Sequence, residues 1–125
     1  MNKKRPVNLD ISTISMPVTA IVSILHRITG IILFVGLVFL FYAFDLSLES
    51  QEGFDQVADV LQNNFLAKFV IWGVVSALMY HFVAGVKHLF MDLGHFEELD
   101  SGRKAAVANL VIAGVLVVLA GVWIW

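Results

Sequence analysis

The sequence contains no cysteine. This absence excludes disulfides, thiolate-ligated iron–sulfur clusters, thioether-attached haem and a cysteine nucleophile. Any metal chemistry must therefore use the four histidines or the carboxylates.

Charge is also scarce, and neither sign dominates. Charged residues make up 14% of the 125 residues, whereas a soluble domain carries about 25%. Hydrophobic residues make up 59%, and the formal net charge is -2. A protein that binds nucleic acid through its phosphates needs a basic excess, so no nucleic-acid partner is expected. The composition instead predicts a protein embedded in the lipid bilayer.

Three apolar runs are each about as long as a helix that crosses a bilayer. Helix signals extend the runs, because Pro17 suits a first helical turn and Gly94 suits the position after a helix end. The expected spans are about 17–44, 68–93 and 104–125. We therefore predict an all-α integral membrane protein with three transmembrane helices in a single membrane-anchor domain, residues 1–125. In the third span, Gly114 and Gly121 beside Ala113 and Ala120 predict a helix-packing seam.

Basic residues predict the orientation of these spans. Seven of the eight lie before or early in the first span or in and beside the second loop, and only Lys68 lies in the first loop. By the positive-inside rule the N-terminus is cytoplasmic and the C-terminus lies outside. The predicted outer interface then carries Trp72, Trp123 and Trp125. No cleavable signal peptide follows Lys3, Lys4 and Arg5, so we expect a multi-pass protein of the bacterial inner membrane.

The outer loop has an amphipathic pattern. Apolar residues recur there at helical spacing opposite polar ones, as Phe54, Val57, Ala58, Leu61 and Phe65. The pattern predicts a short helix lying on the outer membrane surface, with a structural role.

His81 lies deep in the second span, where an imidazole is unfavourable without a partner. A ligand or proton-relay role and a hydrogen-bonded structural role are both open. Ala77 and Gly85 flank it one turn away on each side, and would admit either a flat macrocycle edge or a close helix. On the same face, His88 and Asp92 continue a polar stripe in which His88 is the candidate partner of Asp92.

The first span carries a matching polar cluster at the same membrane face, with Ser23, Arg27 and Gly30 on one side and His26 at its border. Arg27 beside a hydroxyl can hydrogen-bond a quinone carbonyl, and His26 with Arg27 can neutralise carboxylates such as haem propionates. The alternative is that Arg27 and His26 only anchor their helix at the headgroups. For Lys87 in the second span, we expect an interfacial role in which the side chain extends to the headgroups.

A haem iron in a membrane without cysteine most naturally takes two histidine ligands from opposite faces. Only His81 lies near mid-span, because His26 and His88 lie close to the surface and His95 falls in the solvated cytoplasmic loop. The second ligand would therefore have to come from another chain.

Two motifs carry a resemblance to a known family. Arg5-Pro6-Val7-Asn8-Leu9 precedes Ser23-Ile24-Leu25-His26-Arg27-Ile28-Thr29-Gly30, and the second motif runs from His81 through Gly85, Lys87, His88 and Asp92 to Gly94. With the length and three-span topology, they resemble the cytochrome b membrane-anchor subunits of succinate dehydrogenase, the larger of two small anchors. Lys87 stands where many members carry arginine.

The resemblance implies a function for the cluster. His81 would be an axial ligand of one haem b shared with the second anchor subunit, and Ser23 and Arg27 would help to form the ubiquinone site. His26, His88 and Asp92 would lie near the haem propionates or in the second shell, and no residue would be catalytic. A flavoprotein subunit would oxidise succinate, an iron–sulfur subunit would pass the electrons inward, and this chain alone would have no dehydrogenase activity.

Three other functions compete with this one. The chain could be a purely structural anchor for soluble redox subunits, with its histidines in interhelical hydrogen bonds, or the anchor of a related fumarate reductase. A small transporter with a proton relay along His81, His88 and Asp92 is disfavoured, because three spans without inverted symmetry leave little room for alternating access.

Overall fold

The computed structural model describes residues 7, 9, 10 and 15–125, and contains four helices in that part of the chain. They are α1 (Val18–Glu49), α2 (Gln51–Asn63), α3 (Phe65–Asp92) and α4 (Leu99–Ile124). The helices α1, α3 and α4 are long and apolar enough to cross a membrane. These findings confirm the all-α class, the three spanning helices and the short helix between the first two.

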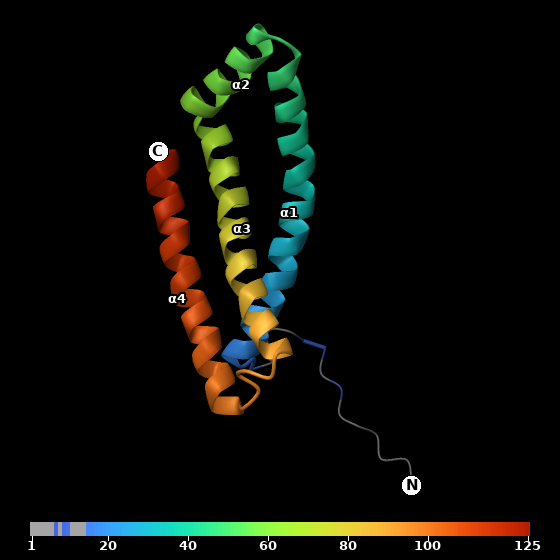
Figure 1. The fold of residues 1–125 in the computed structure, drawn as a ribbon, viewed down its shortest axis with the longest axis vertical. Helices are drawn as coiled ribbons and strands as arrows, with labels where there is room; N and C mark the ends of the chain where they lie inside the picture. The colour runs from blue at the N-terminus through green and yellow to red at the C-terminus, as the bar shows by residue number, and fades with distance from the viewer. Residues whose placement is uncertain (1–6, 8, 11–14) are drawn as a thin grey trace.

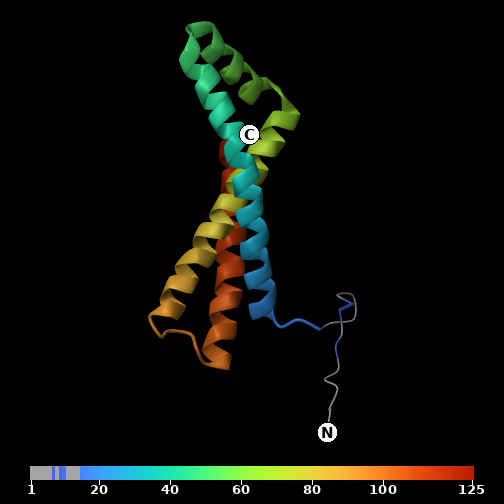
Figure 2. The ribbon, with the colours of Figure 1, turned by 90° about the vertical axis from the view of Figure 1, so that its right-hand side faces the viewer.

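The helix α3 lies between α1 and α4 and packs on both. Figures 1 and 2 show α1 and α4 running in the direction opposite to α3, with α2 crossing from the end of α1 to the start of α3. The start of α1 and the end of α3 therefore lie at the same end of the bundle. This is the arrangement on which the expected shared site depends.

The helices extend beyond the apolar runs. The helix α1 continues to Glu49, and α2 follows after a single extended residue, Ser50, whose hydroxyl accepts the N–H of Gly53 at 3.0 Å. The helix α3 begins at Phe65 because the Asn64 side chain caps it. The polar residues at the helix ends also adopt the helical conformation, although they interrupt the apolar runs from which the spans were predicted.

The end of α3 is a glycine-terminated turn, as the sequence predicts. Gly94 has a φ of +91°, a left-handed conformation that side chains disfavour. The N–H of His95 bonds to the carbonyl of Phe90, and that of Gly94 to Met91, both at 3.0 Å. This pair of bonds is a Schellman motif, which satisfies carbonyls that the helix end leaves free.

Small residues form the seam between α3 and α4. Ala106, Ala113 and Ala120 repeat every seven residues and are all buried. At Gly121 an added Cβ would lie 3.1 Å from Nε1 of Trp72, whereas at Gly114 it would meet nothing within 4 Å. The expected seam therefore includes Gly121 but not Gly114, because the two glycines border the alanine stripe at different levels of the bundle.

Two aromatic side chains of α3 form hydrogen bonds with the neighbouring helices. The Tyr80 hydroxyl donates to the carbonyl of Val22 in α1 at 2.8 Å, and Nε1 of Trp72 donates to the carbonyl of Val117 in α4 at 2.9 Å. Such bonds give aromatic side chains inside hydrocarbon a partner for their polar atoms.

The aromatic residues at the α2 end of the bundle bear on the predicted outer interface. The rings of Trp72 and Trp125 lie 6.0 Å apart between centroids. Trp123, which precedes Trp125 by two residues, is exposed. Lys3, Lys4 and Arg5, which support the predicted orientation, lie outside the described residues. The direction of the chain across the membrane therefore stays a prediction.

The close contact at Gly121 predicts a stability difference between two glycines of α4. Gly121→Val should lower the free energy of unfolding by about 1–3 kcal/mol, because the new side chain overlaps the Trp72 ring. Gly114→Val is the matched control and should be tolerated, since that position is open. Thermal unfolding of the detergent-solubilised variants measures both, and equal midpoints would contradict this packing.

Candidate functional site

Three histidines from two helices form a single cluster. His26 of α1 stacks on His81 of α3, with ring centroids 4.1 Å apart and an interplanar angle of 13°. The same His26 ring meets His88 of α3 at 4.9 Å between centroids and a tilt of 54°. All three rings are half-buried. We call His26, His81 and His88 the histidine column.

Helical spacing accounts for this arrangement. His81 and His88 are seven residues apart, which places them on one face of α3 about two turns from each other. Gly85 lies between them, and a Cβ there would be 3.9 Å from Nε2 of His26. This is an ordinary van der Waals distance, so the His26 ring borders Gly85 in the space between the two α3 histidines without a tight contact.

On α1, the lack of a side chain at Gly30 leaves room for the His81 ring. A Cβ added at Gly30 would lie 3.2 Å from Cε1 of His81. The small residues around His81 were compatible with either a flat macrocycle or a neighbouring helix. In the structure it is α1 that approaches α3 at both glycines.

The hydrogen bonds of His81 determine its tautomer. Its Nδ1 lies 3.1 Å from Oγ1 of Thr29 and 3.1 Å from the main-chain carbonyl of His26. The Thr29 hydroxyl donates its own proton to that same carbonyl at 2.9 Å. The carbonyl can only accept, and the Thr29 hydroxyl has its proton on that carbonyl, so both oxygens place a proton on Nδ1; in the neutral ring the lone pair is then on Nε2.

Nε2 of His81 forms no hydrogen bond with any residue that the structure describes. A neutral imidazole with a donating Nδ1 and an unengaged Nε2 has the form in which histidine binds a metal. Within the described residues, no group of three or more histidines and carboxylates could hold a metal ion. His81 can therefore supply one ligand to a metal whose other ligands come from elsewhere.

Thr29 is a residue of the site that the sequence pattern does not predict. The available signal was its spacing, because a threonine three residues after a histidine in a helix can bond that histidine's carbonyl. Thr29 is 9% exposed, so its hydroxyl is held within the helix interface. What the sequence does not reveal is that this hydroxyl meets a ring from another helix.

Ser23 and Arg27 lie one turn apart on α1, next to the histidine column but outside it. Ser23 is half-buried and Arg27 is exposed. Neither side chain forms a hydrogen bond or ion pair within the described part of the chain. The structure thus brings the two predicted residues to the same end as the histidines, while leaving the guanidinium open to a molecule outside this chain.

The polar stripe on α3 differs from the expectation at two residues. Asp92 is exposed and forms no ion pair with His88, because the His88 ring turns to pack against His26. Lys87 does not extend to the headgroups as expected. It is 9% exposed, and its Nζ reaches only the sulfur of Met91, at 3.8 Å. The inner face of α3 packs against its neighbours here, which encloses the Lys87 stem.

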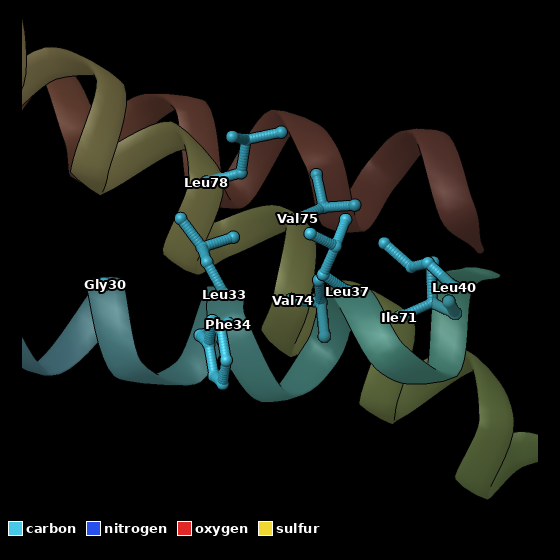
Figure 3. Close-up of a pocket in the computed structure, with 9 residues that line it drawn as sticks. All are labelled: Gly30, Leu33, Phe34, Leu37, Leu40, Ile71, Val74, Val75 and Leu78. Atoms are coloured by element: carbon cyan, nitrogen blue, oxygen red, sulfur yellow. The ribbon is translucent and has the colours of Figure 1, made fainter. Parts of the chain in front are cut away.

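An apolar groove begins beside the column. It encloses about 470 Å³ between α1 and α3, and Figure 3 shows its side chains converging from the two helices. Its lining consists of Gly30, Leu33, Phe34, Leu37, Leu40, Ile71, Val74, Val75 and Leu78. Gly30 is shared with the His81 contact, so the groove continues from the imidazole toward the middle of the bundle. Such a surface suits hydrocarbon or an apolar ligand edge.

Comparison with known proteins places this geometry in a family context. Residues 1–120 match the family model described as "Succinate dehydrogenase/Fumarate reductase transmembrane subunit". The chain is 42% identical to the succinate dehydrogenase cytochrome b556 subunit of Coxiella burnetii, over 100% of both chains. It is 33% identical to the subunit of the same name from Paracoccus denitrificans, over 92% of this chain and 88% of that one. It is also similar to the succinate dehydrogenase hydrophobic membrane anchor subunit of Halobacterium salinarum, with 28% identity over 76% of this chain and 72% of the relative.

The two glycines of the site predict different responses to the same substitution. Gly30→Ala should be less stable than Gly85→Ala by about 1 kcal/mol, because only the first methyl group displaces the His81 ring from its rotamer. Both changes gain the same helix propensity, which cancels in the comparison. Thermal unfolding of the two detergent-solubilised variants measures the difference. A Gly30→Ala protein as stable as Gly85→Ala would show that the contact is not tight.

Proposed function

The chain belongs to the transmembrane-subunit family of succinate dehydrogenase and fumarate reductase, and on this premise we propose that it binds one haem b and part of a ubiquinone-reduction site. It is a membrane subunit of a succinate dehydrogenase complex. The observation that carries the proposal is the unengaged Nε2 of His81 with Nδ1 held by two oxygen acceptors.

The residues present fit a haem. One imidazole nitrogen is the contribution that a bis-histidine haem requires from each side, and the cytochrome names of the relatives accord with it. A second ligand would have to come from another chain, which we take to be the second membrane-anchor subunit, because the His26 ring stacks flat on the His81 ring. When bound, the haem supplies one-electron redox chemistry within the membrane.

The other two residues of the histidine column can bind the propionate groups of the haem. His26 and His88 can donate hydrogen bonds to propionates, and the buried Lys87 adds a positive charge that no carboxylate within the described residues neutralises. An ionised Asp92 can accept hydrogen bonds but cannot donate them to a propionate. We therefore place it behind His88, one turn further along α3, and not in contact with the haem.

Ser23 and Arg27 are the proposed quinone contacts. The exposed guanidinium donates to a quinone carbonyl, and the Ser23 hydroxyl one turn away adds a second donor. Both groups stabilise negative charge that develops on the oxygen during reduction. They lie at the same end as the histidine column, which keeps the quinone close to the iron–sulfur subunit from which electrons arrive.

The proposed complex divides the reaction among its subunits. A flavoprotein subunit oxidises succinate, and an iron–sulfur subunit carries the electrons to the quinone held by this chain and the second anchor. The complex lies in the bacterial inner membrane, with the N-terminus of this chain and the quinone site on the cytoplasmic side. This chain alone is expected to have no succinate-oxidising activity.

Replacement of His81 tests the haem proposal. In the complex purified with all its subunits, His81→Ala should abolish most of the b-type band in the reduced-minus-oxidised absorbance spectrum, because one axial ligand is lost. His95→Ala is the control, since His95 is exposed in the loop between α3 and α4. A full band in an assembled His81→Ala complex would overturn the assignment. Absence of the band from the wild type would leave a structural anchor.

Replacement of the two quinone contacts tests the second site. Arg27→Ala or Ser23→Ala should reduce quinone reductase activity by about 10- to 100-fold, which corresponds to the loss of one hydrogen bond to a charged oxygen. The haem band and the reduction of a soluble dye by succinate should be retained. Arg103→Ala is the control, because Arg103 is exposed at the start of α4. Unchanged quinone kinetics in both variants would remove these residues from the site.

A further inference from the structure

We propose that Thr29 is a positioning residue for His81, and that its hydroxyl, together with the His26 carbonyl, sets the tautomer and the electron donation of the imidazole. The inference rests on the proposed role of His81 as a haem ligand. It adds the two oxygen atoms of this chain that accept the hydrogen bond from Nδ1 of His81.

The Thr29 hydroxyl is held in one direction. Oγ1 donates to the His26 carbonyl at 2.9 Å within the first turns of α1, and the side chain is almost completely buried. Its proton is therefore engaged, and the oxygen presents only lone pairs to Nδ1 of His81 at 3.1 Å. The hydroxyl and the carbonyl form a two-oxygen acceptor for a single N–H.

The opposite tautomer is excluded by the same two oxygens. An unprotonated Nδ1 would direct its lone pair at the carbonyl oxygen, which has no proton to offer. The Thr29 hydroxyl could donate to such a nitrogen only by giving up its bond to the carbonyl, and the carbonyl oxygen would still face an unprotonated nitrogen. The Nδ1–H form satisfies all three groups at once.

The plane of the ring is fixed as well. The stacked ring of His26 covers one face of His81 at 4.1 Å between centroids, and Gly30 borders the Cε1 edge so closely that an added Cβ would lie 3.2 Å away. Rotation of the imidazole about its own bond would break both contacts and the Nδ1 hydrogen bonds. The chain therefore presents Nε2 in a direction set before any ligand binds, which lowers the entropic cost of ligation.

Acceptors behind a ligating imidazole change its electronic character. A hydrogen bond from Nδ1–H to an oxygen makes Nε2 a stronger donor, and a stronger donor favours the more highly charged, oxidised iron. Loss of one of the two acceptors weakens this effect. The remaining carbonyl preserves the tautomer, so the haem should stay bound while its midpoint potential rises.

The test uses the complete complex with two variants of Thr29. Thr29→Val removes the hydroxyl and keeps the shape, whereas Thr29→Ser keeps the hydroxyl and removes a methyl group. We expect a b-type absorbance band in both, an upward shift of the haem midpoint potential in Thr29→Val by redox titration, and a wild-type potential in Thr29→Ser. Loss of the band in Thr29→Val with retention in Thr29→Ser would also support the role of the hydroxyl.

Two results would overturn the inference. One is a wild-type potential in Thr29→Val, and the other is an equal shift in Thr29→Ser, which would assign the effect to side-chain volume. Either result, with the band still absent from His81→Ala, leaves His81 as the ligand and rejects only the role of Thr29. A band that persists in His81→Ala rejects the haem proposal itself.

Discussion

The hydrogen bonds between α1 and His81 are the constraint on which the site depends. Inside hydrocarbon a polar group has no water to bond, so each one must find a partner within the protein. Nδ1 of His81 finds two on α1, the Thr29 hydroxyl and the His26 carbonyl. These bonds hold α1 and α3 in register at this level and leave Nε2 as the one ring atom able to bind something new.

Close approach of the helices makes those bonds possible. Gly30 contributes to this approach, because a Cβ there would lie only 3.2 Å from Cε1 of His81. The Tyr80 hydroxyl adds a further bond between the same two helices. On the other side of α3, the alanine seam and the Trp72 bond secure α4. The central helix is thus held on both flanks by hydrogen bonds and close packing.

The tertiary structure corrects the expected contacts of two residues, His88 and Lys87. The sequence places His88 one turn from Asp92, but in the structure the His88 ring packs at a tilt against the ring of His26. Lys87 has the length to reach the headgroups, yet it lies on a face that packs against the rest of the bundle. Helical spacing specifies which residues share a face, and it does not specify which face another helix covers.

The sequence alone determined the class of the molecule and the depth of its polar groups. Runs of apolar residues predict three spans because hydrocarbon thickness sets the length of a crossing helix. The same runs place His81 deep and bring Ser23, His26, Arg27 and His88 to one end. Only the tertiary structure decided the partners of each group, including the contact of the Thr29 hydroxyl with Nδ1 of His81. The physical reason is that depth follows from composition along one helix, whereas a hydrogen bond between helices depends on the rotation and distance of both.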